Sequence, residues 1–189
     1  KGRYFWNKRT SDAFKKGIEY FNRAIDLEPD YAAAYDGLSD SYLMLACRGV
    51  LPITETFKKA KDAAEHALTI DPELGEARAS LAHVRLHGWE WEGLDEEFRR
   101  ALELNPGYAF AHYWYAEYLM AAGRPDEAVA SVRRALEVDP LSSVLNASMG
   151  MILYLARRAP EAIDALRKGL EMDPGHFLLH FRLGLVHMQ

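Results

Sequence analysis

The stretch ALELNP at residues 101–106 is one of five similar phrases along the chain. The others are AIDLEP at 24–29, ALTIDP at 67–72, ALEVDP at 135–140 and GLEMDP at 169–174. The prolines that close them are separated by 43, 34, 34 and 34 residues. Self-similarity with a period between about 20 and 50 residues indicates an array of structural repeats, so this spacing decides the fold class.

Other positions of the 34-residue unit also keep their residue type. With each proline counted as position 32, position 8 is small and holds Ser39, Ala82, Ala116, Gly150 and Gly184. Position 27 is small as well, with Ala24, Ala67, Ala101, Ala135 and Gly169. Position 7 is expected to be a buried apolar residue and holds Leu38, Leu81, Tyr115, Met149 and Leu183. Small residues at two fixed positions predict that helices cross closely there.

Each unit contains two segments of roughly a dozen residues in which apolar residues recur at helical spacing. Proline lacks a backbone donor and disfavours helix at the residue before it, so each phrase is expected to end a helix. We therefore predict an all-α fold. Its helices are expected near residues 12–27, 31–46, 54–70, 75–87, 92–104, 108–122, 125–138, 142–156, 159–172 and 177–188, after a remnant at 1–8.

The pattern resembles the tetratricopeptide repeat, a 34-residue helix–turn–helix unit with the signature W-x2-L-G-x2-Y…A-x3-F…P. The resemblance implies a right-handed solenoid, or α-α superhelix, that binds proteins or peptides. It covers nearly the whole chain, so we expect a single solenoid over residues 1–189. The expected units are a partial repeat at 1–31, repeats at 32–74, 75–108, 109–142 and 143–176, and a half repeat at 177–189.

Two segments depart from the period. The 43-residue interval places nine extra residues around Cys47–Pro52, between the helices of the second repeat. The third repeat has HGWEWEG at 87–93, where a short glycine turn is usual. Long insertions in solenoids sometimes carry function. We favour a packed structural loop for the first segment and packing for Trp89 and Trp91, and the role of residues 46–54 stays open.

The amino-acid sequence of particular stretches indicates a more specific group of similar proteins. Three stretches look like the repeat regions of bacterial multidomain regulators: KGRYFWNKRT at 1–10, FNRAIDLEPDYAAAYDGLSDSYLML at 21–45 and HGWEWEG. These include winged-helix transcription regulators, nucleotide cyclases and serine/threonine kinases. Their effector domains lie upstream of the repeats, so the resemblance implies no activity for this stretch itself.

Composition excludes several functional classes. No apolar run approaches the roughly 20 residues of a membrane-spanning helix. The net charge is −5 and the basic residues are scattered in pairs, which argues against direct nucleic-acid binding. Cys47 is the only cysteine, which excludes an internal disulfide and a cysteine-based zinc site and fits a reducing compartment. We expect a cytoplasmic protein, and the start at Lys1 suggests a piece of a longer chain.

Signals for catalysis are weak. GLSDS at 37–41 resembles the G-x-S-x-G nucleophile elbow, but Ser41 stands in place of its last glycine. Ser39 already has a role as the small residue at position 8. No phosphate-binding glycine loop, dinucleotide fingerprint or calcium loop is found. We therefore expect no enzyme, no catalytic residues and no cofactor.

Histidines stand four residues apart at His83/His87 and at His176/His180, which places each pair on one side of a helix. The first pair has zincin spacing, but Val84 occupies the position of the catalytic glutamate. A zinc site also needs a third protein ligand, and none stands at an obvious spacing. We expect no metal site.

In this family the first helix of each pair lines a concave surface, mainly through positions 2, 5, 6, 9, 12 and 13. On this chain the resemblance implies a partner-binding face made of Asp36, Asp40, His83, Phe110, Tyr113, Trp114, Glu117, Met151, Tyr154 and Phe181. The same positions also hold Met120, Ser148, Leu155 and Arg182. Aromatic residues are favoured anchors, and the acidic ones favour a protein segment with basic and apolar side chains. Packing inside the superhelix is the alternative role for the aromatic residues.

These patterns predict a protein- or peptide-binding scaffold. It would be the regulatory or assembly region of a larger bacterial signalling or transcription-regulating protein. Self-association as a homo-oligomer is the alternative, because the half repeat at 177–189 leaves an apolar end face. No direct nucleic-acid or membrane partner is expected.

Overall fold

The computed structural model describes residues 1–188, and every regular element within them is an α-helix. These helices are α1 (Gly2–Asn7), α2 (Ser11–Leu27), α3 (Ala32–Cys47), α4 (Ile53–Ile70), α5 (Gly75–His87), α6 (Leu94–Leu104), α7 (Ala109–Ala121), α8 (Pro125–Val138), α9 (Ser143–Leu155), α10 (Ala159–Met172) and α11 (Phe177–His187). The predicted all-α fold is confirmed, with bounds within two residues of the predicted ones. None of these helices combines the length and apolarity needed to cross a membrane.

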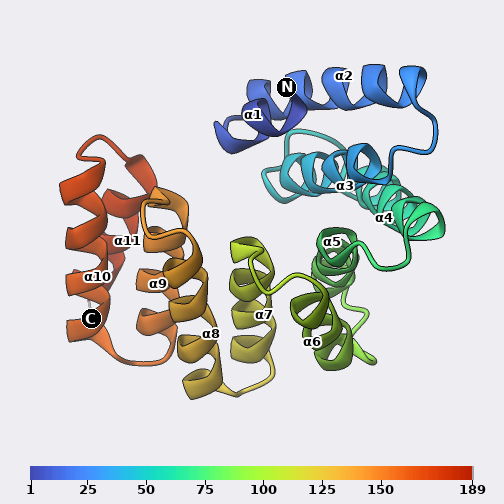
Figure 1. The fold of residues 1–189 in the computed structure, drawn as a ribbon. Coiled ribbons are helices and arrows are strands. Elements are labelled where there is room, and N and C mark those ends of the chain that lie inside the picture. The colour runs from blue at the N-terminus through green and yellow to red at the C-terminus, as the bar shows by residue number, and fades with distance from the viewer. Residues whose placement is uncertain (189) are drawn as a thin grey trace. The chain divides into compact units, whose positions relative to one another are not determined.

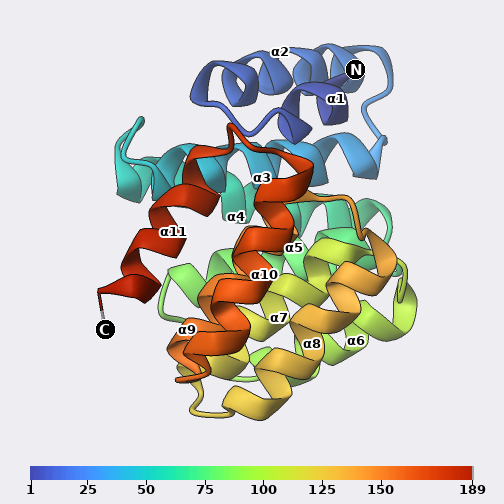
Figure 2. The ribbon, with the colours of Figure 1, turned by 90° about the vertical axis from the view of Figure 1, so that its left-hand side faces the viewer.

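Contacts between helices divide the chain into two compact units, residues 1–105 and a second unit that begins at Pro106. In the first unit α1 pairs with α2, α3 with α4 and α5 with α6, and each pair contacts the next (Figure 1). Figure 2 shows the short α1 beside the longer α2. In the second unit α7 pairs with α8 and α9 with α10, while α11 packs on both α9 and α10. Helices therefore pack in chain order.

The residue before each repeated proline ends the second helix of a pair. These residues leave the helical region with φ between −132° and −141°, and they are Glu28, Asp71, Asn105, Asp139 and Asp173. A proline ring clashes with a helical conformation at the preceding residue, which is the physical reason for the break. The period read from the prolines is thus the period of the helix pairs.

The first helix of each pair is followed by a residue with positive φ. Gly49 and Gly123 take this conformation with φ of 64° and 74°. Arg9, Trp89 and Arg157 take it with φ between 54° and 61°. A left-handed conformation is strained for a residue with a Cβ and free of strain for glycine. Three of the five turns therefore carry some backbone strain.

The small repeat positions are required by close packing. A Cβ added at Gly150 would lie 2.4 Å from the side chain of Leu166, and one at Gly169 would lie 2.7 Å from Leu179. Both are shorter than a real carbon–carbon contact, so these crossings exclude a larger residue. The core of the second unit surrounds them and includes Leu119, Val129, Val132, Ile152, Leu153, Leu166 and Leu179.

The nine extra residues of the second repeat mostly lengthen its helices. α3 and α4 span 16 and 18 residues, against 13 and 14 in α7 and α8. The connection at 48–52 is only two residues longer than the one at 122–124. The loop expected around Cys47–Pro52 is therefore short, because Pro52 caps α4 with φ of −55° and the helix starts directly after it.

Candidate functional site

A pocket of about 180 Å³ lies in the second unit, where three first helices of successive pairs meet. Its lining residues are Tyr113, Glu117 and Met120 from α7, Ser148, Met151, Ile152 and Leu155 from α9, and Arg182 from α11. α9 packs against both α7 and α11, which brings these side chains together. All of them except Ile152 stand at the repeat positions named above for the partner-binding face.

The α7 wall of the pocket carries a hydrogen-bonded pair one helical turn apart. The Tyr113 hydroxyl donates to Glu117 Oε1 over 2.6 Å. Burial, and then the charge of Glu117 and this hydrogen bond, raise the pKa of Tyr113. The phenol therefore stays neutral and keeps the Glu117 carboxylate in one orientation.

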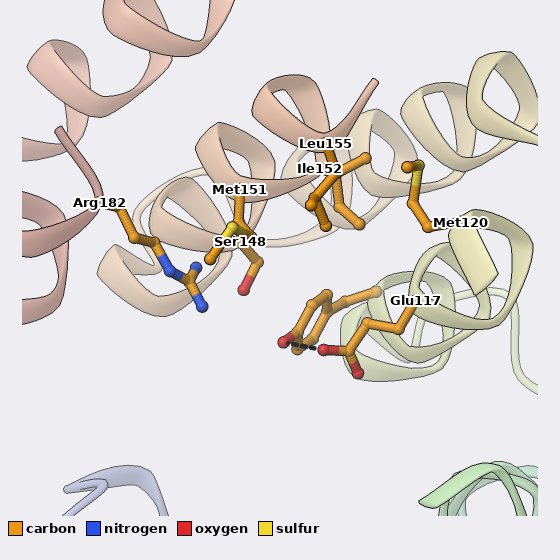
Figure 3. A pocket seen from close by; sticks show the side chains of 8 residues that line it. Glu117, Met120, Ser148, Met151, Ile152, Leu155 and Arg182 are labelled. Carbon is orange, nitrogen blue, oxygen red and sulfur yellow. Dashed lines mark hydrogen bonds between the residues drawn. The ribbon is translucent and has the colours of Figure 1, made fainter. Parts of the chain in front are cut away.

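Arg182 supplies the opposite charge. Its Nε and Nη1 atoms are buried and find no hydrogen-bond acceptor among residues 1–188. Figure 3 shows its side chain beside Ser148 and Met151, with Glu117 on the other side of the pocket. A buried donor without an acceptor costs about 1–3 kcal/mol, and more when it is charged. A carboxylate from a ligand would remove this cost through charge-assisted hydrogen bonds.

The rest of the pocket is apolar. Met120, Met151, Ile152 and Leu155 form this part of the wall, and Leu155 is half exposed. Methionine side chains are flexible and polarizable, so they adapt to apolar groups of different shape. No histidine or cysteine is among the residues that line this pocket. The arrangement suits recognition of a side chain between two charges.

Three residues of the predicted partner-binding face line the pocket, namely Tyr113, Glu117 and Met151. The other face positions that the repeat register gives in this region, Met120, Ser148, Leu155 and Arg182, line it as well. The sequence does not show that Nε and Nη1 of Arg182 lack an acceptor among residues 1–188, because this depends on the neighbours of α11 in space.

Trp114 and Phe110 lie in an aromatic cluster of α7. Trp114 is 2% exposed, and its ring meets Tyr108 edge-on with 5.8 Å between centroids. The Phe110 ring is half-buried, and its centroid also lies 5.8 Å from that of the Trp114 ring. A side chain as buried as Trp114 offers a partner almost no surface, so its place in the structure is that of a packing residue.

Tyr154 and Phe181 lie outside the pocket. Tyr154 is half-buried and packs against the apolar core of the second unit. Phe181 is half exposed, and its ring stacks on Phe177 with 6.1 Å between centroids. Neither of these two aromatic residues is therefore among the residues that line the pocket with Tyr113 and Met151.

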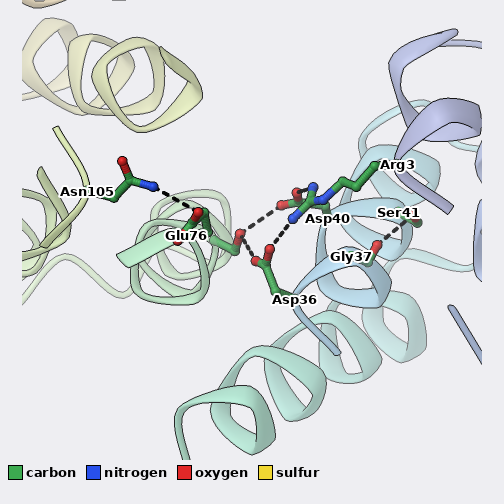
Figure 4. A network of polar contacts seen from close by, with 8 residues as sticks. Arg3, Asp36, Gly37, Asp40, Ser41, Glu76 and Asn105 are labelled. Carbon is green, nitrogen blue, oxygen red and sulfur yellow. Dashed lines mark hydrogen bonds and ion pairs between the residues drawn. The ribbon is translucent and has the colours of Figure 1, made fainter. Parts of the chain in front are cut away.

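In the first unit, Asp36 and Asp40 are buried on α3 and are bound by other parts of the same unit (Figure 4). Arg3 of α1 forms ion pairs with both, and its Nη1 lies 2.7 Å from Asp40 Oδ2. Ser80 Oγ of α5 lies 2.6 Å from Asp36 Oδ1 and 2.9 Å from Asp40 Oδ1. Arg3 thus supplies the basic group expected from a partner, and a partner could reach these carboxylates only by displacing it.

The contacts of Ser80 indicate that this acidic pair holds a proton. A hydroxyl has one hydrogen, so it cannot donate to two ionised carboxylates at once. The Ser80 hydroxyl is within donor distance of both carboxylates, and a proton on Asp36 would relieve the competition for its single hydrogen. Burial first, opposed by Arg3 and supported by the charge of Asp40, raises the pKa of Asp36 to about 7.

His83 is buried on α5 beside His87. The two Nε2 atoms are 3.1 Å apart, and the rings meet edge to face. In this arrangement a neutral ring donates its N–H to the nitrogen of the other. The pair places two imidazole nitrogens side by side on α5.

Comparison with known proteins finds a matching repeat model, similar sequences and similar folds. Residues 96–151 match the family model described as "Tetratricopeptide repeat". The chain is similar to the transcriptional regulator HilA of Salmonella typhimurium and of Salmonella typhi, in each case 24% identical over 132 residues. The match covers 70% of this chain and 24% of each relative, so the chain spans about a quarter of the length of these regulators.

Solved structures of similar fold include two proteins that are described as TPR proteins. TTC0263 of Thermus thermophilus superimposes with a TM-score of 0.78 at 20% identity, over 100% of this chain and 96% of that one. YrrB, described as "a TPR protein with an unusual peptide-binding site", gives a TM-score of 0.57 at 24% identity, over 90% of this chain and 83% of that one. At these identities the likeness concerns the fold alone.

Proposed function

We propose that this tetratricopeptide-repeat protein is a non-catalytic scaffold that binds a segment of a partner protein in the pocket between α7, α9 and α11. The observation that carries the proposal is Arg182, whose buried Nε and Nη1 lack an acceptor among residues 1–188 beside an apolar wall. A bound carboxylate would supply that acceptor. The description of YrrB as a peptide-binding protein agrees with this proposal but concerns that protein.

The pocket suggests the chemistry of the bound segment. A volume of about 180 Å³ holds one or two side chains rather than a large ligand. The methionine wall favours an aliphatic or aromatic side chain as the anchor. Arg182 favours an acidic group on one side of this anchor, and Glu117 favours a basic group or N–H donor on the other. The segment would thus carry an apolar residue between two opposite charges.

The role of the whole protein is proposed from its relatives. The similar curated proteins are transcriptional regulators, and the chain matches about a quarter of their length. We infer that this repeat region is the regulatory or assembly part of a larger bacterial signalling or transcription-regulating protein. A bound partner segment would then control or recruit that protein.

Selection of displayed peptides on the immobilised chain tests the proposal. The selected peptides should carry an acidic residue next to an apolar one. Arg182→Ala should weaken their binding at least tenfold, about 1.4 kcal/mol. Arg134→Ala is the matched control, because Arg134 is an exposed arginine of α8 outside the pocket. Equal loss in both variants, or no loss in Arg182→Ala, would contradict the proposed site.

Self-association remains a second candidate function because α11 presents an uncovered apolar face. Phe177 is 78% exposed, and a Cβ added at Gly184 would meet no atom of the described chain within 4 Å. In the repeat register Gly184 stands at the position where helices cross closely. Sedimentation at several concentrations tests this. A mass that rises with concentration and returns to the monomer value in Phe177→Ser would support self-association over partner binding.

A further inference from the structure

A second and larger pocket, of about 510 Å³, lies in the first unit between α4 and the turn that follows α5. Its lining residues are Ile53, Thr54, Phe57, Lys58 and Lys61 from α4, and Val84, His87, Gly88, Trp89 and Glu90 from α5 and the turn. It involves none of the residues of the pocket between α7, α9 and α11. Two apolar side chains at its rim are open to solvent, with Ile53 60% and Trp89 81% exposed.

Trp89 occupies a backbone position that does not suit it. Its φ is 61°. The equivalent positions are glycines after α3 and α7, Gly49 and Gly123, and arginines after α1 and α9, Arg9 and Arg157. A left-handed conformation is strained for a residue with a Cβ, and a large exposed apolar side chain gains nothing from the fold. Backbone strain of this kind clusters at binding sites. What sets Trp89 apart from the arginines of the other strained turns is a large apolar side chain that is 81% exposed.

The turn around Trp89 is fixed by its neighbours. Lys61 Nζ lies 2.8 Å and 2.6 Å from the two carboxylate oxygens of Glu90. Arg85 Nη2 donates to the carbonyl oxygen of Glu92 over 2.5 Å. The Trp89 ring also stacks on Trp91, with 5.9 Å between centroids. The ring is therefore held in place before any partner arrives, which lowers the entropy lost on binding.

Charges on the wall define what the pocket accepts. Glu90 is neutralised by Lys61, whereas Lys58 pairs only with Asp62 in an exposed contact one turn along α4. Asp62 does not line the pocket, and an exposed pair of this kind contributes little to stability. The Lys58 ammonium can therefore turn to a carboxylate brought by a partner. The lining as a whole is apolar with an excess of positive charge.

We propose that this pocket, bounded by Ile53, Phe57, Lys58 and Trp89, is a second docking surface for a protein segment. The segment presents an aromatic or aliphatic side chain directly beside a carboxylate. Its apolar group packs between Trp89 and Ile53, and its carboxylate pairs with Lys58. The scaffold then has two independent contact sites, one in each unit.

The test uses three blocked tripeptides, acetyl-Asp-Phe-Asp-amide, acetyl-Lys-Phe-Lys-amide and acetyl-Asp-Ala-Asp-amide, titrated into the 15N-labelled chain. The indole N–H resonance that disappears in Trp89→Gly identifies Trp89. We expect the Asp-Phe-Asp peptide to shift this resonance. The other two peptides should bind with at least fivefold lower affinity. Lys58→Glu should reverse the preference between the Asp and Lys peptides.

Trp89→Gly separates binding from folding. Glycine accepts the left-handed backbone, so its melting temperature should be equal to or above that of the native chain, while affinity falls at least tenfold. Ile53→Ser is the second variant, with the same loss of affinity. The proposal is overturned if millimolar Asp-Phe-Asp peptide leaves the Trp89 resonance unmoved, or if both variants bind as the native chain does. Arg182→Ala should leave this binding intact, so failure of one site does not imply failure of the other.

Discussion

The hydroxyl of Tyr113 lies 2.6 Å from Oε1 of Glu117, one turn further along α7, and both side chains line the pocket that also holds Arg182. The hydrogen bond joins Tyr113 to Glu117. Both residues belong to the predicted partner-binding face, and both line the pocket. The orientation of this carboxylate therefore depends on the Tyr113 hydroxyl.

Tyr113→Phe keeps the ring and removes this donor. We expect the free energy of unfolding to fall by about 1 kcal/mol, as for loss of one intramolecular hydrogen bond. The affinity for peptides selected on the pocket should fall because Glu117 loses its fixed orientation. Urea denaturation and calorimetric titration measure the two effects. Tyr118→Phe on the same helix is the control, since Tyr118 does not line the pocket and should leave affinity unchanged.

Trp114→Ala should destabilise the second unit rather than alter its binding surface. The side chain is 2% exposed, and removal of a buried tryptophan costs about 3–5 kcal/mol. Trp114→Phe keeps much of the ring volume, so its free energy of unfolding should fall by less. Thermal denaturation measures both variants. A stable and cooperative Trp114→Ala that binds pocket peptides poorly would restore Trp114 to the partner-binding face.

Two glycines at the same repeat position should respond oppositely to alanine. A Cβ at Gly150 would lie 2.4 Å from Leu166, so Gly150→Ala should lower the free energy of unfolding by about 1–3 kcal/mol. A Cβ at Gly184 meets nothing within 4 Å, and alanine is the better helix former by up to about 1 kcal/mol. Gly184→Ala should therefore be neutral or stabilising. Urea denaturation of the two variants side by side measures the contrast, and equal effects would show that the register is misassigned at α11.

The buried acidic pair predicts how stability depends on pH. The pKa of Asp36 is raised from 3.8 to about 7, chiefly by burial, so the folded chain holds this proton more tightly than the unfolded chain. The stabilisation from Asp36 is complete below the pKa that it has in the unfolded chain. It is lost as the pH rises through the pKa that it has in the folded chain. The contribution of Asp36 to the free energy of unfolding should thus decline as the pH rises from about 4 to about 7.

Asp36→Asn isolates this contribution. The amide resembles the protonated acid and can donate to Ser80, so the variant should be at least as stable as the native chain at pH 8 and should vary less with pH. Urea denaturation at pH 5.5 and pH 8 measures both chains. Strong destabilisation of Asp36→Asn at pH 8 would mean that ionised Asp36 is needed to bind Arg3, and that the proton lies elsewhere.

The prolines and small residues of the sequence determined the helices and their order. Glu28, Asp71, Asn105, Asp139 and Asp173 leave the helix because a proline follows each of them, which is a purely local effect. Gly150 and Gly169 stand where helices cross closely, and their spacing repeats because the pairs repeat. Local backbone chemistry and a fixed period are both readable along one chain. The fold class and the helix bounds could therefore be predicted.

Only the tertiary structure decided what each face residue does. Positions in the repeat placed Tyr113 and Trp114 together on α7, yet one lines a pocket and the other is buried against Tyr108. The carboxylate of Asp36 meets Arg3 and Ser80, which are 33 and 44 residues away in the sequence. Burial, hydrogen-bond partners and unpaired donors depend on which side chains from distant segments fill the same space. A periodic pattern specifies where a helix lies, but it does not specify those neighbours.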